Sequence, residues 1–336
     1  PTLLPGVPTP TPTPTPIPPT PTPTPAPEGI SVGSLLAEWD IEYAPDLMSY
    51  GFTNVIFDST FGSIWVNNLT TVLKFDSSGR LLQIMARYGK CSSMPEVVLA
   101  QIPGSSCISL GFEPDDVPDC EAWWCSGPRI SDLAIDSSGN IYIVDGGMFH
   151  IWKFDPSGNY ILKWGEYDAP FGSGFHGSKM SITTDDSVYV SNTGDPYGIH
   201  VFNSGGNELR SWGTSDWLPQ TIDRDSSGNL WVVGGSKKLR KYSPQGTLLA
   251  EYSADSSGRS KTGIANLQID SKDNIYVGYS EQWGSGITDI VIEVYDPSGE
   301  PLSTLDLPGL FTIDDHDNLY VVDDTNWRIL KYTINN

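Results

Sequence analysis

The chain has 336 residues and a formal net charge of −22. Such an acidic balance argues against nucleic acid and anionic membrane surfaces as partners, because both carry negative charge themselves. No run of 18 apolar residues is present, so we expect no membrane span.

Residues 1–28 are dominated by alternating proline and threonine and differ in composition from the rest of the chain. Proline at this density excludes helices and interior strands, so residues 1–29 are expected to form an extended polyproline II tail. At about 3.1 Å per residue, such a tail reaches on the order of 85 Å. Leu3, Leu4 and Val7 would supply an apolar anchor at its far end. Seven threonines of the tail form a ladder suited to O-glycosylation: Thr9, Thr11, Thr13, Thr15, Thr20, Thr22 and Thr24.

Residues 30–336 repeat one short phrase six times: an apolar run, an Asp-led turn and a second apolar run. It occurs at residues 54–64, 132–141, 181–188, 220–230, 266–275 and 310–319. A period of roughly 40–50 residues built from short strands is typical of blades around an axis. The clearest unit, residues 130–164, contains four strand-like runs separated by turn residues such as DSSGN and DPSGN. Each unit is therefore expected to be a four-stranded antiparallel meander with strands a to d.

The second run of each unit is apolar almost throughout, as in IYIV at residues 141–144. A sheet with one wet face would alternate apolar and polar residues, so both faces of these strands are expected to be covered. Stacking of blades around an axis provides that cover. A β-sandwich is the alternative, but six near-copies of one meander favour a six-bladed β-propeller, an all-β fold.

The last unit carries the phrase LYVVDDTNWRILKY at residues 319–332, which closely resembles the NHL repeat. The unit at residues 141–155 matches less fully, because it lacks the Asn and Arg of the phrase. The resemblance covers about residues 30–336 and implies a six-bladed propeller. It implies nothing about a substrate, since the phrase is structural.

The sixth unit ends with its third strand, so its fourth strand must come from elsewhere. An open outer edge would otherwise invite aggregation. The segment GSLLAEWDIEYAP at residues 33–45 resembles GNYILKWGEYDAP at residues 158–170, a fourth strand with its connector. We therefore expect residues 34–39 to pair beside residues 329–333 and close the ring. Donation of this strand to a neighbouring subunit would satisfy the same hydrogen bonds.

All four cysteines lie in one insertion between blades 1 and 2, residues 88–129: Cys91, Cys107, Cys120 and Cys125. An even number of clustered cysteines in an irregular loop predicts two disulfides, whose pairing the sequence leaves open. A zinc site is the alternative, although no C-x-x-C is present. Disulfides and the Pro-Thr tail together indicate an extracellular or cell-surface location.

The b–c and d–a connections share one face of a propeller, and they carry every long segment of this chain. Functional residues concentrate on loops of this kind. The expected ligand-binding face carries aromatic residues that could stack on a sugar or contact a protein: Trp123, Trp124, Phe171, Phe175, Tyr197, Trp217, Trp283 and Trp327. The alternative is that these rings only pack the loops onto the ring.

These features favour an extracellular structural or adhesive protein, a filament or sheath subunit whose arm contacts a neighbouring copy. A spacer-tethered surface propeller that binds carbohydrate or protein is one alternative. A metal-dependent lyase or lactonase-like enzyme is another, and it would need an acid-amide or histidine cluster. The four histidines lie in different parts of the chain: His150, His176, His200 and His316. We therefore expect no metal, no cofactor and no catalytic residue.

Overall fold

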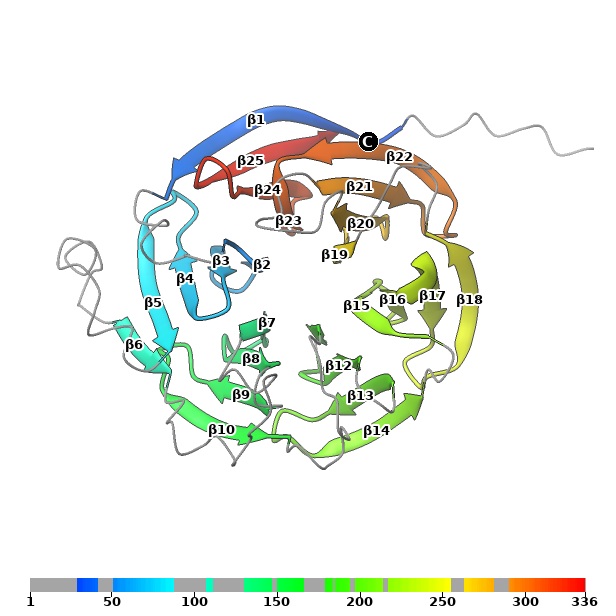
Figure 1. Ribbon diagram of the computed structural model, residues 1–336, viewed down its shortest axis with the longest axis horizontal. Coiled ribbons are helices and arrows are strands. Elements are labelled where there is room, and N and C mark those ends of the chain that lie inside the picture. The colour runs from blue at the N-terminus through cyan, green and yellow to red at the C-terminus, as the bar shows by residue number, and fades with distance from the viewer. Residues whose placement is uncertain are drawn as a thin grey trace, which may run out of the picture.

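The computed structural model shows six β-sheets arranged in a closed ring (Figure 1). The structure describes residues 29–41, 51–87, 107–110, 130–146, 150–165, 179–183, 185–193, 197–213, 217–254, 263–280 and 290–335. Within these residues the only helical turn is η4 (Gly235–Lys237). The prediction of a six-bladed all-β propeller is confirmed.

The strands follow one another from the axis to the rim in blades 1 to 5. Blade 1 holds β2 (Asn54–Asp58), β3 (Ser63–Asn67), β4 (Thr71–Phe75), β5 (Leu81–Arg87) and β6 (Cys107–Leu110). Blade 2 holds β7 (Ile130–Ile135), β8 (Ile141–Asp145), β9 (His150–Phe154) and β10 (Tyr160–Trp164). Blade 3 holds β11 (Met180–Ile182), β12 (Val188–Asn192), β13 (Gly198–Phe202) and β14 (Glu208–Gly213).

Blade 4 holds β15 (Pro219–Arg224), β16 (Leu230–Gly234), β17 (Lys238–Tyr242) and β18 (Leu248–Ser253). Blade 5 holds β19 (Gly263–Ile269), β20 (Ile275–Ser280), β21 (Ile290–Tyr295) and β22 (Pro301–Leu307). Blade 6 is built from both ends of the chain: β23 (Gly309–Ile313), β24 (Asn318–Asp323), β25 (Arg328–Asn335) and β1 (Ser31–Asp40).

The Asp-led turns form because the aspartate side chain closes the turn that follows it. In blade 2, Asp136 Oδ1 accepts hydrogen bonds from the backbone N–H groups of Ser138 (3.0 Å) and Asn140 (2.8 Å). Gly139 supplies the left-handed conformation that the turn requires, with φ of +79°. The DSSGN sequence is thus a turn whose local chemistry fixes the register of the a–b hairpin.

The core lies between neighbouring blades rather than inside any one of them. Strand β8 is buried along its whole length, as are the corresponding strands β3, β12, β16 and β20. Separate apolar clusters fill the spaces between blades 1 and 2, 2 and 3, 3 and 4, and 4 and 5. A larger cluster joins blades 5, 6 and 1. The continuous apolar second strands therefore have the two-sided cover that the sequence predicts.

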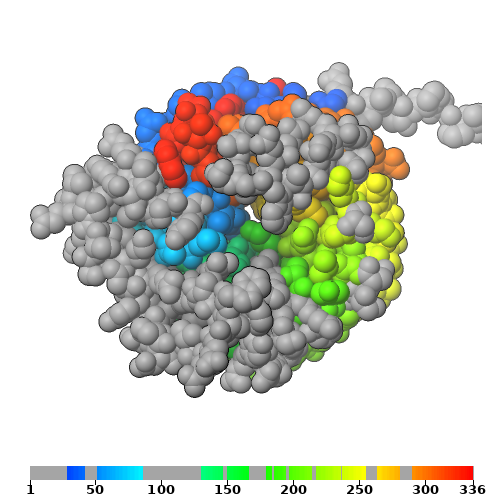
Figure 2. All heavy atoms as spheres, in the orientation of Figure 1, coloured from blue at the N-terminus to red at the C-terminus, as the bar shows by residue number. Residues whose placement is uncertain are grey.

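Blade 6 is closed by the N-terminal strand of the same chain. β1 pairs antiparallel with β25 from Ser31 opposite Asn335 to Asp40 opposite Arg328. An ion pair of 2.6 Å between Glu38 and Arg328 lies across this ladder. In the space-filling view, the blue atoms of β1 lie along the rim beside the red atoms of the last blade (Figure 2). The prediction that residues 34–39 pair beside residues 329–333 is confirmed, within one chain.

Trp39 shows that β1 behaves as a true fourth strand. Its indole covers Gly79 in the c–d turn of blade 1, where an added Cβ would lie 2.2 Å from the Trp39 ring. The same contact recurs between other neighbouring blades: Trp164 covers Gly206, Trp212 covers Gly246 and Tyr252 covers Gly299. An aromatic residue near the end of strand d thus covers the next blade's turn glycine at four of the six junctions.

Blade 1 differs from the expected four strands. β6 adds to the outer edge of β5 in parallel orientation, with Ile84 opposite Cys107 and Arg87 opposite Leu110. A fifth strand covers an edge that would otherwise present unpaired backbone groups. The insertion between blades 1 and 2 therefore contributes to the sheet, which its irregular sequence did not indicate.

Several predictions fall outside the described residues. These are the polyproline II tail with its threonine ladder and apolar anchor, and the side chains of the four cysteines. The extents of the tail (residues 1–29) and of the insertion (residues 88–129) likewise remain predictions. Across the described ranges, no helix has the length and apolarity needed to cross a membrane.

Candidate functional site: a polar pocket on the ring axis

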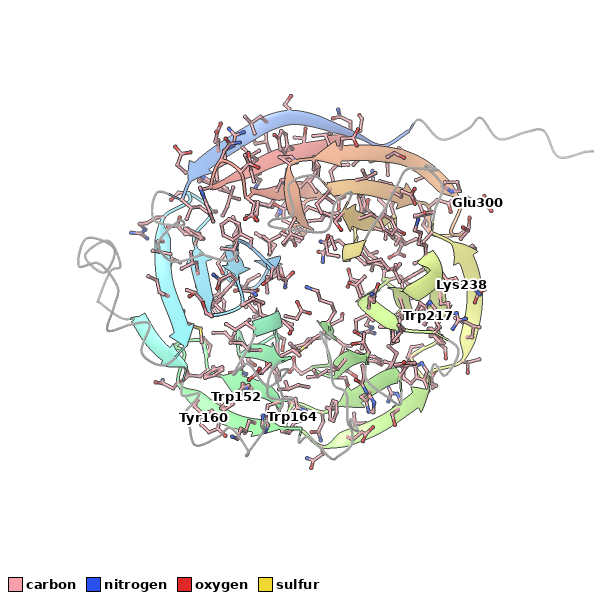
Figure 3. The ribbon with its side chains drawn as sticks, in the orientation of Figure 1. Trp152, Tyr160, Trp164, Trp217, Lys238 and Glu300 are labelled. Atoms are coloured by element: carbon pink, nitrogen blue, oxygen red, sulfur yellow. The ribbon has the colours of Figure 1, made fainter. Side chains whose placement is uncertain are left out.

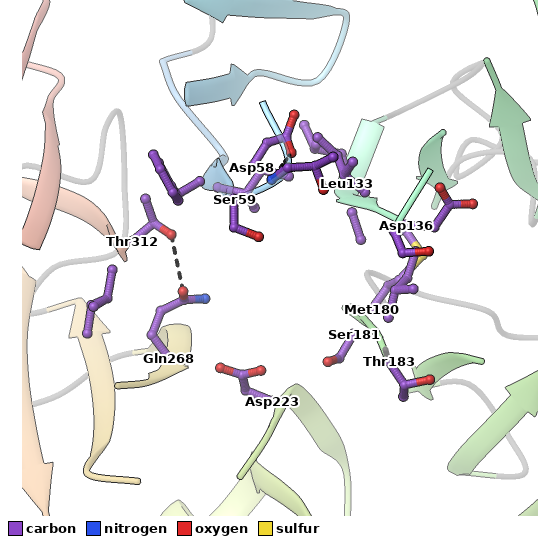
Figure 4. Close-up of a pocket in the computed structure, with 18 residues that line it drawn as sticks. Asp58, Ser59, Leu133, Asp136, Met180, Ser181, Thr183, Asp223, Gln268 and Thr312 are labelled. Carbon is purple, nitrogen blue, oxygen red and sulfur yellow. Dashed lines mark hydrogen bonds between the residues drawn. The ribbon is translucent and has the colours of Figure 1, made fainter. Parts of the chain in front are cut away.

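The innermost strands of the six blades surround a cavity of about 390 Å³ on the axis of the ring (Figure 4). It lies toward the a–b turns, which form the face opposite the long loops. Its walls come from all six blades: Ile56, Phe57, Asp58, Ser59, Thr60, Leu133, Ala134, Ile135, Asp136, Ser137, Met180, Ser181, Ile182, Thr183, Asp223, Gln268, Thr312 and Ile313.

One position of the inner strand decides the chemistry of this cavity. The residue two places before the first residue of each a–b turn is Ile56 in blade 1, Ala134 in blade 2, Ser181 in blade 3, Asp223 in blade 4, Gln268 in blade 5 and Thr312 in blade 6. Blades 1 and 2 therefore contribute apolar side chains, and blades 3 to 6 contribute polar ones. Because blades 1 and 2 lie across the ring from blades 4 and 5, the cavity has an apolar and a polar side.

Asp223 is the one acid at this inner-strand position. Its carboxylate accepts one backbone hydrogen bond on each oxygen, from Arg224 N (2.8 Å) and from Ile269 N of blade 5 (2.9 Å). Burial raises the pKa of Asp223 to about 7, although both hydrogen bonds and the charge of Arg224 act to lower it. A carboxylic acid that titrates near neutral pH inside a cavity is a common mark of a functional site.

Gln268 and Thr312 join blades 5 and 6 beside Asp223. The Thr312 hydroxyl donates to Gln268 Oε1 at 3.1 Å, and Gln268 Nε2 donates to the carbonyl of Leu267 at 3.0 Å. Ser181 approaches from blade 3 and points toward the open centre in Figure 4, as does Asp223. The polar side of the cavity therefore offers an acid, an amide and two hydroxyl groups.

A second polar layer lies two residues earlier in the sequence of each inner strand, and it links the blades to one another. Asn54 Nδ2 donates to Asp132 Oδ1 at 2.6 Å, and Asp132 Oδ2 accepts from Met180 N at 2.6 Å. Lys179 Nζ lies 3.4 Å from Asp132 Oδ1. In blade 5, Asn266 donates to the carbonyl of Phe311 in blade 6 at 2.6 Å. Asn54, Asp132 and Asn266 are buried, and their hydrogen bonds cross from one blade to the next, so this layer holds the ring together.

At the mouth of the cavity, the first acid of the a–b turn is paired within its own blade in blades 2, 4 and 6. Burial acts to raise the pKa of Asp136, but hydrogen bonds from Asn140 and Tyr142 and the charge of Lys153 outweigh it, so the pKa is lowered. Lys153 Nζ lies 3.4 Å from this carboxylate and 4.8 Å from the centre of the Tyr142 ring. Blade 6 repeats the arrangement with Asp314, Lys331 and Tyr320, and blade 4 does so with Asp225, Lys241 and Trp231.

The aromatic residues expected on the loop face divide into three groups. Trp217 is only 4% exposed and packs beneath Arg240, whose guanidinium lies 4.7 Å from the ring centre, so its ring contributes to the core rather than to the accessible surface (Figure 3). Its apolar surface fills the space between blades 3 and 4. Trp327 is partly buried and meets Phe52 edge to face at 5.5 Å, and Tyr197 is half-buried. The rest lie outside the described residues: Trp123, Trp124, Phe171, Phe175 and Trp283.

Within the described ranges, three potential metal-ligating side chains gather only at Asp314, Asp315 and His316. Asp315 and His316 are exposed on an a–b turn, where His316 Nδ1 lies 2.6 Å from Asp315 Oδ1. Asp314 is already bound by Asn318 and by Lys331. This cluster lies on the turn face and is explained by turn formation.

Sequence reasoning did not identify the axial cavity, although a signal was present. The inner strands read NVIFD, DLAID, KMSIT, TIDRD, NLQID and LFTID around the start of each turn. Polar residues two or four places before the turn interrupt strands that are otherwise apolar on both faces. Polar residues at equivalent positions of several repeats indicate a shared axis rather than a solvated face.

No protein-family profile matches the chain, and no curated protein matches it. A structure titled streptogramin B lyase is 11% identical, with 91% of this chain and 98% of that chain covered and a TM-score of 0.54. Raptor from Chaetomium thermophilum is 10% identical, with 92% and 29% covered and a TM-score of 0.55. A protein of unknown function from Bacteroides caccae is 11% identical, with 77% and 81% covered and a TM-score of 0.49.

At such identities, the similarity shows the fold alone. The first two comparisons support the propeller architecture, and the chain spans less than a third of the length of Raptor. Membership of the NHL-repeat family stays a prediction.

Proposed function

We propose that the chain is a binding propeller whose axial cavity takes a small amphipathic molecule. The observation that carries the proposal is the division of the cavity, with Ile56 and Ala134 on one side and Asp223, Gln268 and Ser181 on the other. Small-molecule sites are concave and mainly apolar, with a few convergent polar groups that fix orientation. A volume of about 390 Å³ is of the size used for small ligands.

The proposal is tested with benzyl alcohol, a probe with a compact apolar ring and one hydroxyl group. A probe of this size is expected to bind with a Kd on the order of 1 mM, measured by ligand-observed NMR. Ala134→Phe places a ring in the apolar side of the cavity and should abolish binding. Ala250→Phe makes the same change on the outer strand β18 and should leave binding unchanged. Equal binding by both variants would contradict the proposal.

A second role, assembly through the N-terminal arm, is favoured by the position of β1. β1 is the outermost strand of blade 6, so residues that precede Ser31 are joined to the rim rather than to the axis or a face. An arm joined at the rim can reach another copy without blocking the cavity. We propose an extracellular filament or sheath subunit in which the Pro-Thr arm, O-glycosylated on its threonines, contacts a neighbouring copy.

Assembly is tested by removing residues 1–28. The full chain should form high-mass species in analytical ultracentrifugation and electron microscopy. The shortened chain should keep its far-UV circular dichroism and form no such species. Monodisperse rings from the full native chain would contradict this role. The intact mass of the native protein tests the O-glycosylation, since a mass equal to that of the bare polypeptide would mean that no glycan is attached.

A further inference from the structure

We propose that the ligand of the axial cavity is a small organic cation, an ammonium group on a compact apolar body, with Asp223 as its counter-ion. The inference rests on the proposed function, because it names the chemical class that the same cavity would accept. It is carried by the bonding of the Asp223 carboxylate, by the neutrality of the strands around it and by the charge at the cavity mouth.

The Asp223 carboxylate keeps unused hydrogen-bonding capacity. A carboxylate offers about four acceptor sites, and only two backbone N–H groups donate to Asp223. The neighbouring Arg224 is not used to pair it: its side chain donates to the carbonyl of Gly228 at 3.3 and 3.4 Å and lies over the Tyr189 ring at 5.4 Å. Within the described part of the chain, Asp223 therefore has no ion-pair partner, and its free acceptor sites face the cavity.

The strands packed against β15 carry no charged residue. β11 reads MSI, β12 reads VYVSN, β16 reads LWVVG and β19 reads GIANLQI. Arg224 on β15 itself is the charged group that acts on Asp223. Burial raises the pKa of this carboxyl to about 7, which keeps it partly protonated at neutral pH. An ammonium group beside it would favour the ionised form, because an opposite charge nearby lowers the pKa of a carboxyl.

The face around the cavity mouth carries an excess of acids. The a–b turns hold ten aspartates: Asp58, Asp136, Asp185, Asp186, Asp225, Asp270, Asp273, Asp314, Asp315 and Asp317. Lys153, Lys241 and Lys331 each pair with one of these aspartates, and Lys272 lies within the blade 5 turn, so acids still outnumber bases on this face. A mouth with excess negative charge attracts cations and repels anions before they reach the cavity. The field at the entrance and the acid inside thus select the same sign of charge.

The apolar side of the cavity defines the rest of the ligand. Ile56, Leu133 and Ala134 lie on blades 1 and 2, across the axis from Asp223 on blade 4. A molecule that places its cation on Asp223 would lay its body against these side chains. Hydroxyl groups of Ser181 and Thr312 flank the two ends of the polar side and could accept from the ammonium group.

The experiment compares benzylammonium with benzyl alcohol, two probes of the same size and shape that differ in charge. The wild-type chain should bind benzylammonium about tenfold more tightly at pH 8, since a charge-assisted hydrogen bond is stronger than a neutral one. The preference should fall at pH 5, where Asp223 is protonated. Asp223→Asn should remove the preference for benzylammonium over benzyl alcohol at pH 8.

The outcomes separate this inference from the proposed function. Equal binding of both probes by the wild-type chain at pH 8 would contradict the inference of a cationic ligand. It would leave the proposed small-molecule cavity unaffected. If neither probe binds, both the cationic ligand and the proposed binding cavity are refuted. Benzylammonium binding that survives in Ala134→Phe would place the cation elsewhere on the acidic surface and refute the inference. The comparison between pH 8 and pH 5 uses the wild-type protein, so the inference can be tested even if Asp223→Asn folds poorly.

Discussion

Replacing Gly79 with alanine should destabilise the propeller more than the same replacement at Gly62. Both glycines have a left-handed φ, +82° and +61°, so alanine costs about 1 kcal/mol of backbone strain at each. Only Gly79 is covered, since an added Cβ would lie 2.2 Å from Cγ of Trp39, whereas no atom lies within 4 Å at Gly62. Such overpacking costs about 1–3 kcal/mol. The expected losses of unfolding free energy are about 2–4 and about 1 kcal/mol.

A substitution of Trp39, the residue that contacts Gly79, tests whether β1 is the strand that covers this turn. Trp39 is partly buried, so Trp39→Ala should cost about 2 kcal/mol, roughly half the value for a fully buried tryptophan. In the double variant the steric clash is gone, so the combined loss should fall short of the sum by about 1–3 kcal/mol. Urea unfolding followed by far-UV circular dichroism measures all four free energies.

Two results would refute this account of ring closure. One is an equal loss for Gly79→Ala and Gly62→Ala. The other is strict additivity of Trp39→Ala and Gly79→Ala, which would mean that the two residues do not touch. A midpoint that changes with protein concentration would indicate a strand supplied by another copy, since pairing within one chain is independent of concentration.

Three further outcomes follow from other contacts. The pKa of Asp223 is raised from 3.8 to about 7, so the folded state binds more protons between about pH 4 and 7. The free energy of unfolding should therefore fall as pH rises through that window, by at most about 4 kcal/mol. Asp223→Asn should reduce this pH dependence, as measured by urea denaturation at a series of pH values. An unchanged pH dependence would contradict the raised pKa. Asp273 has φ of +65° and binds Ser226 of the preceding blade through Oδ1 and Oδ2 at 2.7 and 2.6 Å. Asp273→Ala should thus cost about 1 kcal/mol more than Asp273→Gly in urea unfolding, because both variants lose these bonds but only alanine keeps the strain; equal costs would contradict this. Deleting residues 1–40 removes β1 and should lower the melting temperature and promote aggregation, whereas unchanged melting would argue against N-terminal closure.

The ring and its closure could be predicted because their signals are local and repeated. The turn of Asp136 through Gly139 is set by its own residues, and a missing fourth strand can be counted along the chain. The match between residues 33–45 and 158–170 identified the replacement. Trp39 and Trp164, aligned by that match, make the same contact with the next blade's turn glycine.

The axial cavity was not located from sequence, because its walls are short segments that lie forty or more positions apart in the chain. Asp223 and Gln268 become neighbours of Ile56 only when the ring has closed. The burial of Trp217 could not be predicted for a related reason: a tryptophan in a connection has the composition of a binding residue, but its burial depends on the blades on either side. Composition indicates which residues can bind, and topology decides which of them are accessible.

The pairing of Ser31 with Asn335 has a mechanical consequence. The two strand ends lie side by side, so a force that pulls them apart breaks the hydrogen bonds of the β1–β25 ladder one residue pair after another. A pull on Ser31 against the body of the ring instead loads the whole ladder along its length. The β1–β25 seam is therefore expected to be weak towards a pull in one direction and strong towards a pull in the other.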